Sequence, residues 1–262
     1  MQTTDSYSKA IILGATGGIG RHLATELAKH LDFLVLVGQN PDKLSQLQKE
    51  LAGSKAQLSI KVLNLCDKEA LENFGKVLDA DLLVNCAGLA TFSIGSDLAT
   101  EKEQELWQVN YHAPVQLMKL LVQKNRKIRL VQLSSLAALF PHPYLAAYSA
   151  SKAALQTYVL ALHEELINAD SQVRISLYLL GPVQTPIFSQ KLVDALGGSR
   201  FQMKPDRVAH QLYRLFEQGT PYAVVGLRYR LLIYLGKLLP QKWIIHFISS
   251  RLSISLARKN AE

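Results

Sequence analysis

The amino-acid sequence predicts an α/β fold, with helices on both faces of a doubly wound, mostly parallel, seven-stranded sheet. Two observations carry this prediction. Short β-branched or leucine-rich runs alternate regularly with helical patterns, and the first strand runs straight into a cluster of glycines. Alternation of this kind builds βαβ units, whose crossover helices make neighbouring strands parallel. The apolar fraction of 48% and charged fraction of 19% over 262 residues are ordinary for a globular chain.

The expected strands are short apolar runs that end at turn residues, and the expected helices carry apolar residues three or four positions apart. The strands are predicted at Ala10–Leu13, Phe33–Val37, Ser59–Leu63, Asp81–Asn85, Ile128–Leu133, Val173–Leu180 and Tyr222–Val225. Helices are predicted at Ile19–His30, after the turn at Asn40–Pro41, at Glu103–Val122 and at Ala147–Asn168. After Gly181 the pattern loosens, as expected of a segment that covers a substrate.

The composition excludes several classes of protein. Two cysteines, Cys66 and Cys86, are too few for a disulfide framework and fit a reducing compartment. The polar start, Met1–Ser8, lacks the basic and apolar parts of a signal peptide. No apolar run is long enough to cross a bilayer. We therefore expect a cytoplasmic protein, with no metal site.

The net charge of +8 is concentrated near the C-terminus. No Asp or Glu occurs from Gln218 to Ala261, and this stretch alternates basic with apolar residues. Its basic residues are Arg228, Arg230, Lys237, Lys242, Arg251, Arg258 and Lys259. No nucleic-acid motif accompanies them, so we expect no nucleic-acid partner. The pattern resembles an interfacial membrane anchor, and helices packed over the active site or between subunits explain it equally well.

A glycine-rich turn, Gly14–Gly20 (GATGGIG), joins the first strand to the first helix. Glycine is needed where a backbone closely approaches a pyrophosphate or takes a positive φ. The helix that follows offers unpaired N–H groups and a partial positive charge to phosphates. This position in the chain is the one that dinucleotide binding requires.

Tyr148 and Lys152 lie four residues apart at the start of a predicted helix, so both project from one face. The phenol of tyrosine ordinarily titrates near pH ~10. A nearby ammonium stabilises the phenolate and is expected to lower the pKa of Tyr148. The pair therefore predicts a proton-transferring tyrosine.

The glycine spacing and the Tyr-x-x-x-Lys pair together resemble the short-chain dehydrogenase/reductase family, over roughly Lys9 to Phe188. The resemblance implies a Rossmann fold and hydride transfer between NAD(P) and a carbonyl or alcohol. It implies that Tyr148 is the acid/base, that Lys152 also holds the nicotinamide ribose, and that Ser135 orients the substrate oxygen. Asn110 would support a proton relay. Residues 1–262 would form one domain, with a core at about 9–188 and a substrate-covering, basic tail at about 189–262.

The same resemblance implies a set of cofactor-binding residues. Cys86 replaces an asparagine of the family's Asn-Asn-Ala-Gly segment, Leu180 replaces a proline, and Asn64 stands where an aspartate is usual. Besides Tyr148 and Lys152, the expected contacts are Gly14, Thr16, Gly17, Gly18, Ile19, Gly20, Gln39, Asn40, Asn64, Leu65, Asn85, Ala87, Gly88, Gly181, Val183 and Thr185.

The end of the second strand, Gly38-Gln39-Asn40, has no carboxylate to repel a 2′-phosphate and no arginine to clamp one. Because Gln39, Asn40 and Lys43 can hydrogen-bond a phosphate, we expect NADP rather than NAD. The substrate is expected to be lipophilic, since the pocket should be lined by largely apolar residues at 140–144 and 187–188. There His142 either contacts the substrate or is merely exposed.

Two other functions remain open on this fold. One is a non-catalytic dinucleotide sensor or scaffold, which would have no need of the Ser-Tyr-Lys-Asn set. The other is epimerase or dehydratase chemistry, which usually comes with a longer C-terminal substrate domain. We also expect a homo-oligomer, dimer or tetramer, because Ala147–Asn168 carries apolar residues on two sides. A monomer whose tail covers this helix is the alternative.

Overall fold

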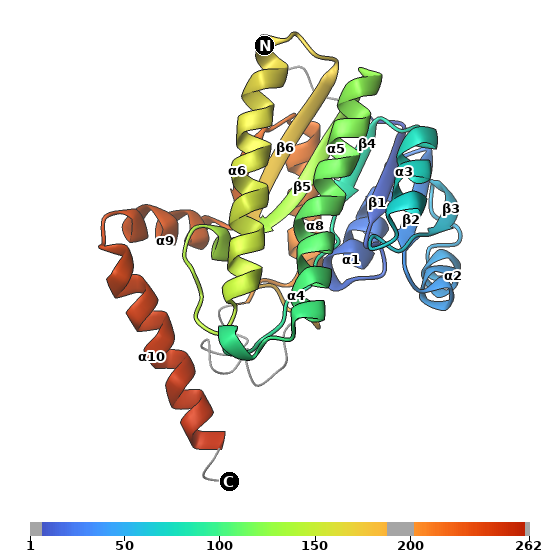
Figure 1. Ribbon diagram of the computed structural model, residues 1–262. Helices are drawn as coiled ribbons and strands as arrows, with labels where there is room; N and C mark the ends of the chain where they lie inside the picture. Colours follow the sequence, from blue (N-terminus) through green and yellow to red (C-terminus); the bar gives the residue numbers. More distant parts are fainter. Residues whose placement is uncertain (1–6, 188–201, 260–262) are drawn as a thin grey trace.

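Seven parallel strands form the sheet at the centre of the computed structural model, in the order β3-β2-β1-β4-β5-β6-β7 (Figure 1). The structure describes residues 7–187 and 202–259. The strands are β1 (Lys9–Leu13), β2 (Phe33–Gly38), β3 (Gln57–Val62), β4 (Leu82–Asn85), β5 (Ile128–Ser135), β6 (Val173–Leu180) and β7 (Tyr222–Val225). The predicted fold class is confirmed.

The central strand β1 pairs with β2 on one side and with β4 on the other. The chain therefore winds outward in two directions from β1, through β2 and β3 and then through β4 to β7. At such a switch point the loops after neighbouring strands diverge and leave a crevice at their carboxyl ends, where α/β proteins bind ligands. Here the crevice lies between the segments that follow β1 and β4.

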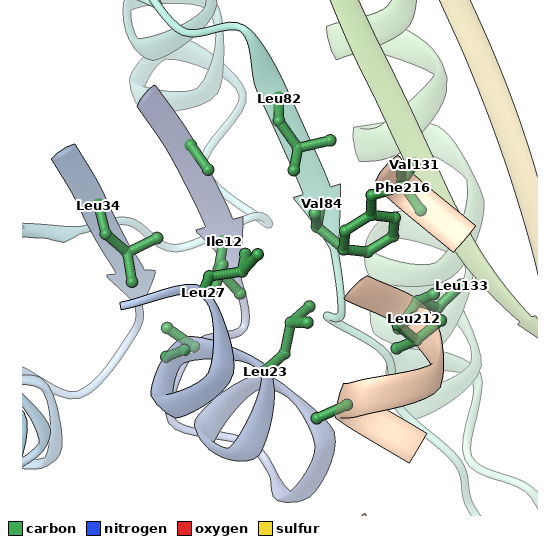
Figure 2. Packing of buried hydrophobic residues seen from close by; sticks show 14 of the residues in the cluster. Ile12, Leu23, Leu27, Leu34, Leu82, Val84, Val131, Leu133, Leu212 and Phe216 are labelled. Carbon is green, nitrogen blue, oxygen red and sulfur yellow. The ribbon is translucent and has the colours of Figure 1, made fainter. Parts of the chain in front are cut away.

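Helices cover both faces of the sheet. On one face lie α1 (Gly18–Leu27), α2 (Pro41–Glu50) and α8 (Pro205–Glu217), and on the other lie α3 (Lys68–Val77), α5 (Ala113–Lys124) and α6 (Ala146–Asn168) (Figure 1). Figure 2 shows the first core, where Leu23 and Leu27 of α1 and Phe216 of α8 meet Ile12 of β1 and Val84 of β4. Truncating a fully buried side chain such as Phe216 to alanine typically costs about 3–5 kcal/mol. This layer fixes the glycine turn between β1 and α1.

The single helix expected at Glu103–Val122 is divided in the structure. Residues Thr100–Trp107 form α4, Gln108–His112 form a π-helical turn (η2), and α5 follows from Ala113. The prediction of one regular helix was wrong, because the spacing of apolar residues does not distinguish an α-helix from a helix with a π-helical insertion. Such insertions are frequent at functional sites, and this one contains Asn110. Helices α3 and α8 were not foreseen from the sequence.

The part of the predicted tail that follows β7 forms two helices, α9 (Leu227–Lys237) and α10 (Gln241–Lys259), at the side of the molecule and outside the two helical layers (Figure 1). α9 packs chiefly on β7 and α10. Two 3₁₀ turns, η1 (Gly95–Asp97) and η3 (Leu136–Ala138), lie in the loops after β4 and β5. Within the part of the chain described, none of the helices combines the length and apolarity that crossing a bilayer requires.

Candidate active site

The glycine turn after β1 is pressed against the end of β4. Gly14 has a φ of +74°, and a Cβ there would lie 2.8 Å from the backbone nitrogen of Ala87. A Cβ on Gly20 would lie 2.1 Å from the carbonyl oxygen of Gly14. Only glycine fits at either position. Gly20 therefore serves to pack the turn closely and does not line the cavity itself.

The N-terminus of α1 opens toward the crevice, with Gly17 as its N-cap. Because glycine has no side chain to bond the first N–H groups, these donors are available to an anion. Gly18 faces Thr185 from the loop after β6, where a Cβ would meet the Thr185 side chain at 2.5 Å. The turn and the Thr185 loop thus form a close-fitting cradle, whose donors suit a pyrophosphate.

Two cavities meet at this cradle. One of about 470 Å³ lies between the turn, the ends of β4 and β5, and the start of α6. The other, of about 230 Å³, lies over the ends of β1, β2 and β3. Both are lined by Gly17, Cys86, Ala87, Gly88 and Leu89. The cavities therefore adjoin one another across the switch point, as the two halves of an extended dinucleotide require.

Tyr148 and Ser135 face each other in the larger cavity. Tyr148 is buried near the start of α6, Ser135 ends β5, and both line the cavity wall. Burial raises the pKa of Tyr148, and a hydrogen bond with the Ser135 side chain counteracts part of that rise. The Ser135 hydroxyl also accepts a hydrogen bond from the backbone N–H of Ala137 at 3.2 Å, which fixes its position. The pair forms a hydroxyl-bearing wall that can bind a carbonyl oxygen.

Lys152 lies one helical turn beyond Tyr148 and is also buried. Its Nζ donates a hydrogen bond to the carbonyl oxygen of Leu133 at 3.3 Å. Burial lowers the pKa of Lys152 to about 8, and the nearby Cys86 opposes that shift. The expectation that Lys152 lowers the pKa of Tyr148 is not met in this structure. Burial outweighs the opposing effects on the phenol, and the opposing hydrogen bond comes from Ser135.

Asn110 ties the loop after β4 to the catalytic helix. Its side chain donates to the Leu89 carbonyl and accepts from the Leu89 N–H, both at 2.8 Å. It also donates to Oγ of Ser151 at 3.0 Å, and that hydroxyl donates to the carbonyl of Tyr148 at 2.8 Å. Asn110 does not line either cavity. Its bonds hold the backbone around Tyr148 and Leu89 in register.

Four of the predicted cofactor contacts lie together at the carboxyl ends of β1, β2 and β3. Thr16, Gln39, Asn64 and Leu65 line the smaller cavity. Asn40 does not line it, because its side chain caps α2 by accepting a hydrogen bond from the N–H of Lys43 at 2.9 Å. The expected binding of a phosphate by Asn40 therefore competes with its role as a helix cap. Asn64 accepts from the N–H of Cys66 at 3.0 Å, which leaves its second lone pair for a ligand.

Asn85 is buried and supports the site from beneath. It donates to the side chain of Gln132 at 2.9 Å and accepts from the N–H of Ala87 at 3.1 Å. It lines neither cavity, so it acts by holding the Ala87–Gly88 segment. Of the remaining expected contacts, Gly14 lines the smaller cavity and Ala87 lines both. The others line the larger cavity, namely Gly17, Gly18, Ile19, Gly88, Gly181, Val183 and Thr185.

The loop expected to line the substrate pocket contributes less than predicted. His142 and Ile187 line the larger cavity, whereas Phe140 and Tyr144 pack into apolar clusters instead. Phe188 lies outside the described residues. His142 is half-buried, so the reading of it as merely exposed was wrong. The sequence carried no signal for this burial, which depends on how the loop folds against α6.

His142 has a defined hydrogen-bonding state. Burial lowers its pKa, and its Nδ1 lies 2.6 Å from the carbonyl oxygen of Phe140. Because a carbonyl can only accept, Nδ1 carries the proton of the neutral ring and Nε2 is left as an acceptor. The backbone N–H of His142 also donates to Oγ of Ser149 at 3.2 Å. His142 therefore brings an acceptor to the residues that line the cavity, in addition to the hydroxyls of Ser135 and Tyr148.

Comparison with known proteins agrees with this geometry. The short chain dehydrogenase family model matches residues 8–195. The uncharacterized oxidoreductase YusZ of Bacillus subtilis (strain 168) is 28% identical over 242 residues, which cover 85% of this chain and 83% of that protein. Dehydrogenase/reductase SDR family member 7B of Mus musculus is 32% identical over 180 residues, or 63% of this chain. The match spans only 55% of that mouse protein.

Bovine 3-ketodihydrosphingosine reductase is 28% identical over 240 residues, covering 82% of this chain and 70% of the bovine protein. Among solved structures, one described as giving insights into 7beta-hydroxysteroid dehydrogenase stereoselectivity superposes on this chain with a TM-score of 0.78 and 20% sequence identity. The superposition covers 95% of this chain and 100% of the other, and at this identity it supports the fold alone. From the family match and the site geometry together, the chain belongs to the short-chain dehydrogenase/reductase family and is an NAD(P)-dependent oxidoreductase.

Proposed function

We propose that the protein interconverts a ketone and a secondary alcohol on a lipophilic substrate, with Tyr148 as the proton-transferring residue. The observation that carries this proposal is the buried Ser135–Tyr148 pair on the wall of the 470 Å³ cavity. No carboxylate lines that cavity among the described residues, and the Tyr148 phenol lies there beside the Ser135 hydroxyl, where both can reach the oxygen of one carbonyl.

The chain's own residues divide the chemistry between them. In the reducing direction the Tyr148 phenol gives its proton to the substrate oxygen, and the Ser135 hydroxyl donates a hydrogen bond to the same oxygen. Lys152 supplies positive charge behind the phenol and a donor for the nicotinamide ribose. When bound, the nicotinamide supplies the hydride that reaches the carbonyl carbon, so that C=O becomes CH–OH.

The shape and the hydrogen-bond donors of the site fit a dinucleotide. The cradle between Gly18 and Thr185 is closed to any larger side chain, and the α1 N–H groups point to it. The smaller cavity would hold the adenosine, and the ends of β4 and β6 would hold the nicotinamide. We propose NADP as the preferred form, because the smaller cavity is lined at the end of β2 by Gly38 and Gln39 rather than by a carboxylate.

A lipophilic substrate is supported by the cavity wall. Most of the larger cavity's wall is apolar and includes Ile19, Leu89, Ala90, Leu136, Leu145 and Ile187, while Ser134 and Gln202 add polar groups to those already described. The bovine relative is named for a lipid ketone, 3-ketodihydrosphingosine, which is consistent with this choice. We assign His142 as a positioning residue, because its Nε2 would accept a hydrogen bond from a donor elsewhere on the substrate.

We further propose a homo-oligomer formed through α6, a cytoplasmic location, and peripheral contact with a membrane. Both cysteines are free thiols, as expected in a reducing compartment. On α6, Leu160 and Ile167 are exposed apolar side chains that a partner subunit could cover.

The deciding experiment is a screen of NADPH and NADH oxidation against ketones and 3-oxoacyl thioesters of increasing chain length. We expect turnover that rises with chain length and is faster with NADPH. The Tyr148→Phe variant is the control for contaminating reductases. Binding of cofactor with no turnover of any carbonyl or alcohol in either direction would instead favour the non-catalytic sensor.

A further inference from the structure

Helix α9 is apolar on its inner and its outer side. Its inner side is anchored, because Tyr229 and Ile233 are buried. The ring of Tyr229 lies against Gly181, where a Cβ would meet it at 2.6 Å. A helix side made of apolar residues is normally covered by other parts of the protein, yet the outer side of α9 faces solvent.

The exposed apolar side chains continue from α9 into α10, and we call this surface the tail face. It consists of Leu227, Leu231, Leu232, Tyr234, Leu235, Leu238, Leu239, Trp243 and Phe247, each at least half exposed. Soluble monomers rarely expose contiguous apolar surface of this kind unless it binds something. The tail face therefore marks a binding surface.

The charge around the tail face indicates what binds it. Arg228, Arg230, Lys237 and Lys242 are all exposed on the same two helices. The sequence from Gln218 to Ala261 contains no acidic residue. A second copy of the tail face would bring like charges together, which disfavours self-association. Anionic lipid headgroups would pair with these cations, while Trp and Tyr suit the boundary between headgroups and acyl chains.

The tail face is also connected to the active site. Gly236 of α9 lies against Phe140, where a Cβ would meet the ring at 2.8 Å. Ile248 of α10 packs on the apolar cluster that contains Tyr148, Leu145 and Leu106. Docking through this face would thus place the membrane beside the elements that surround the catalytic cavity.

We propose that α9 and the start of α10 dock on an anionic bilayer surface, lying in its interface without crossing it. The docking itself is independent of the proposed reaction. Its purpose, delivery of a lipid ketone or alcohol to the cavity, rests on the proposed function.

The test is co-sedimentation of the full chain with vesicles of phosphatidylcholine alone or with 30% phosphatidylserine added. We expect binding to the anionic vesicles that weakens as salt is raised, and little binding to neutral ones. In a Trp107→Phe background Trp243 is the sole tryptophan, and its emission should shift to shorter wavelength on docking. Absence of binding to anionic vesicles would overturn the proposal.

Two double variants separate apolar from charged contributions. Leu235→Gln/Leu238→Gln changes residues that are 50% and 70% exposed. The matched control is Val62→Gln/Val77→Gln on the sheet edge and α3, at 48% and 76% exposure. We expect the first to weaken vesicle binding roughly tenfold or more, and the control to bind as wild type. If both double variants lost vesicle binding equally, the tail face would not be the surface that docks.

The second double variant is Lys237→Gln/Lys242→Gln, compared with Lys49→Gln/Lys127→Gln, which removes equal charge elsewhere. We expect about a tenfold loss of binding only for the tail pair. Equal loss for both pairs would mean attraction by net charge alone and would overturn the proposal.

Two further outcomes are decisive. The first is the particle mass without lipid. If wild type has twice the mass of a monomer and Leu235→Gln/Leu238→Gln has the mass of a monomer, the tail face binds a second copy, and the proposal is overturned. Tyr148→Phe should bind vesicles like wild type, whether or not the proposed reaction is correct.

Discussion

Nζ of Lys152 lies 6.0 Å from the centroid of the Tyr148 ring, and both side chains are buried on the same helix. The opposing effect on the pKa of the phenol nevertheless comes from the Ser135 side chain and not from this ammonium. The same burial penalises both charged forms, so it raises the pKa of Tyr148 and lowers that of Lys152. The first prediction tests the phenol of Tyr148 by its effect on turnover, and the second tests the buried ammonium of Lys152 by its effect on stability.

Tyr148→Phe should remove nearly all turnover, a loss of at least a thousandfold in kcat, while cofactor affinity stays within a few-fold of wild type. The ring still packs in its cluster, and only the proton-carrying oxygen is lost. Tyr158→Phe on the same helix is the matched control, since its ring contacts Tyr111 away from the cavity. Steady-state kinetics and cofactor titration measure both effects. Turnover near wild type in Tyr148→Phe would refute the assignment.

Lys152→Met should stabilise the protein most below pH 8. The pKa of Lys152 falls from 10.5 to about 8 on folding, so the unfolded chain binds more protons between these values and stability rises with pH there. The cost of burying the charge is fully present below pH 8 and lost by about pH 10.5, and it amounts to about 3 kcal/mol at most. Melting temperatures of wild type and variant at pH 7 and pH 10 measure the difference.

The melting temperature of Lys152→Met should exceed that of wild type by less at pH 10 than at pH 7. Lys49→Met, on the exposed side of α2, is the control and should show no such dependence on pH. A gain for Lys152→Met that is equal at both pH values would show that Lys152 is not buried as a charge.

His142→Phe should lower kcat/KM through KM for substrates that carry a hydrogen-bond donor away from the carbonyl, and should spare substrates without one. The pKa of His142 is lowered by burial, so Nε2 stays an acceptor at neutral pH and becomes a donor only at acid pH, below the ordinary 6.5. Wild type should therefore lose kcat/KM on the acid side, and His142→Phe should lack that limb. His142→Asn, which restores an acceptor, should recover part of the loss.

Comparison of the sequence predictions with the structure shows which features are local. The strands, the glycine turn and the positions of Tyr148 and Lys152 follow from periodicity and from short-range spacing, and they could be predicted. The burial of His142 and the bonds of Asn110 to Leu89 and Ser151 depend on contacts between distant segments. Ser151 was missed for the same reason, because its bond to Asn110 spans 41 residues. The cap made by Asn40 is local, at the helix start that the sequence predicts.

Cofactor preference should be decided at the end of β2. A Cβ on Gly38 would lie 3.4 Å from Leu44 and from Thr16, so a side chain fits there with a small adjustment. Gly38→Asp should shift the ratio of kcat/KM values toward NAD by tenfold or more, because its carboxylate repels a 2′-phosphate. Gly38→Asn has the same shape without the charge and should change the ratio far less.

The complementary change is Gln39→Arg, which should strengthen NADP use because a guanidinium binds the phosphate with two hydrogen bonds. Gln39 is exposed and lines the smaller cavity, so the longer side chain has room. If neither Gly38→Asp nor Gln39→Arg alters the ratio, the adenosine ribose does not lie where we place it.

The oligomer should form through α6. The monomer alternative required the tail to cover this helix. Ile248 of α10 packs only near the start of α6, and Leu160 and Ile167 stay exposed further along it. Light scattering at micromolar concentration should therefore give a mass of at least twice 29.1 kDa. Leu160→Glu should lower that mass, because a carboxylate would be buried without a partner in the interface. Val77→Glu, an exposed apolar residue on α3, is the control and should not. A mass of 29.1 kDa that persists on concentration would show that α6 needs no partner, and the exposed side chains would then be ordinary surface.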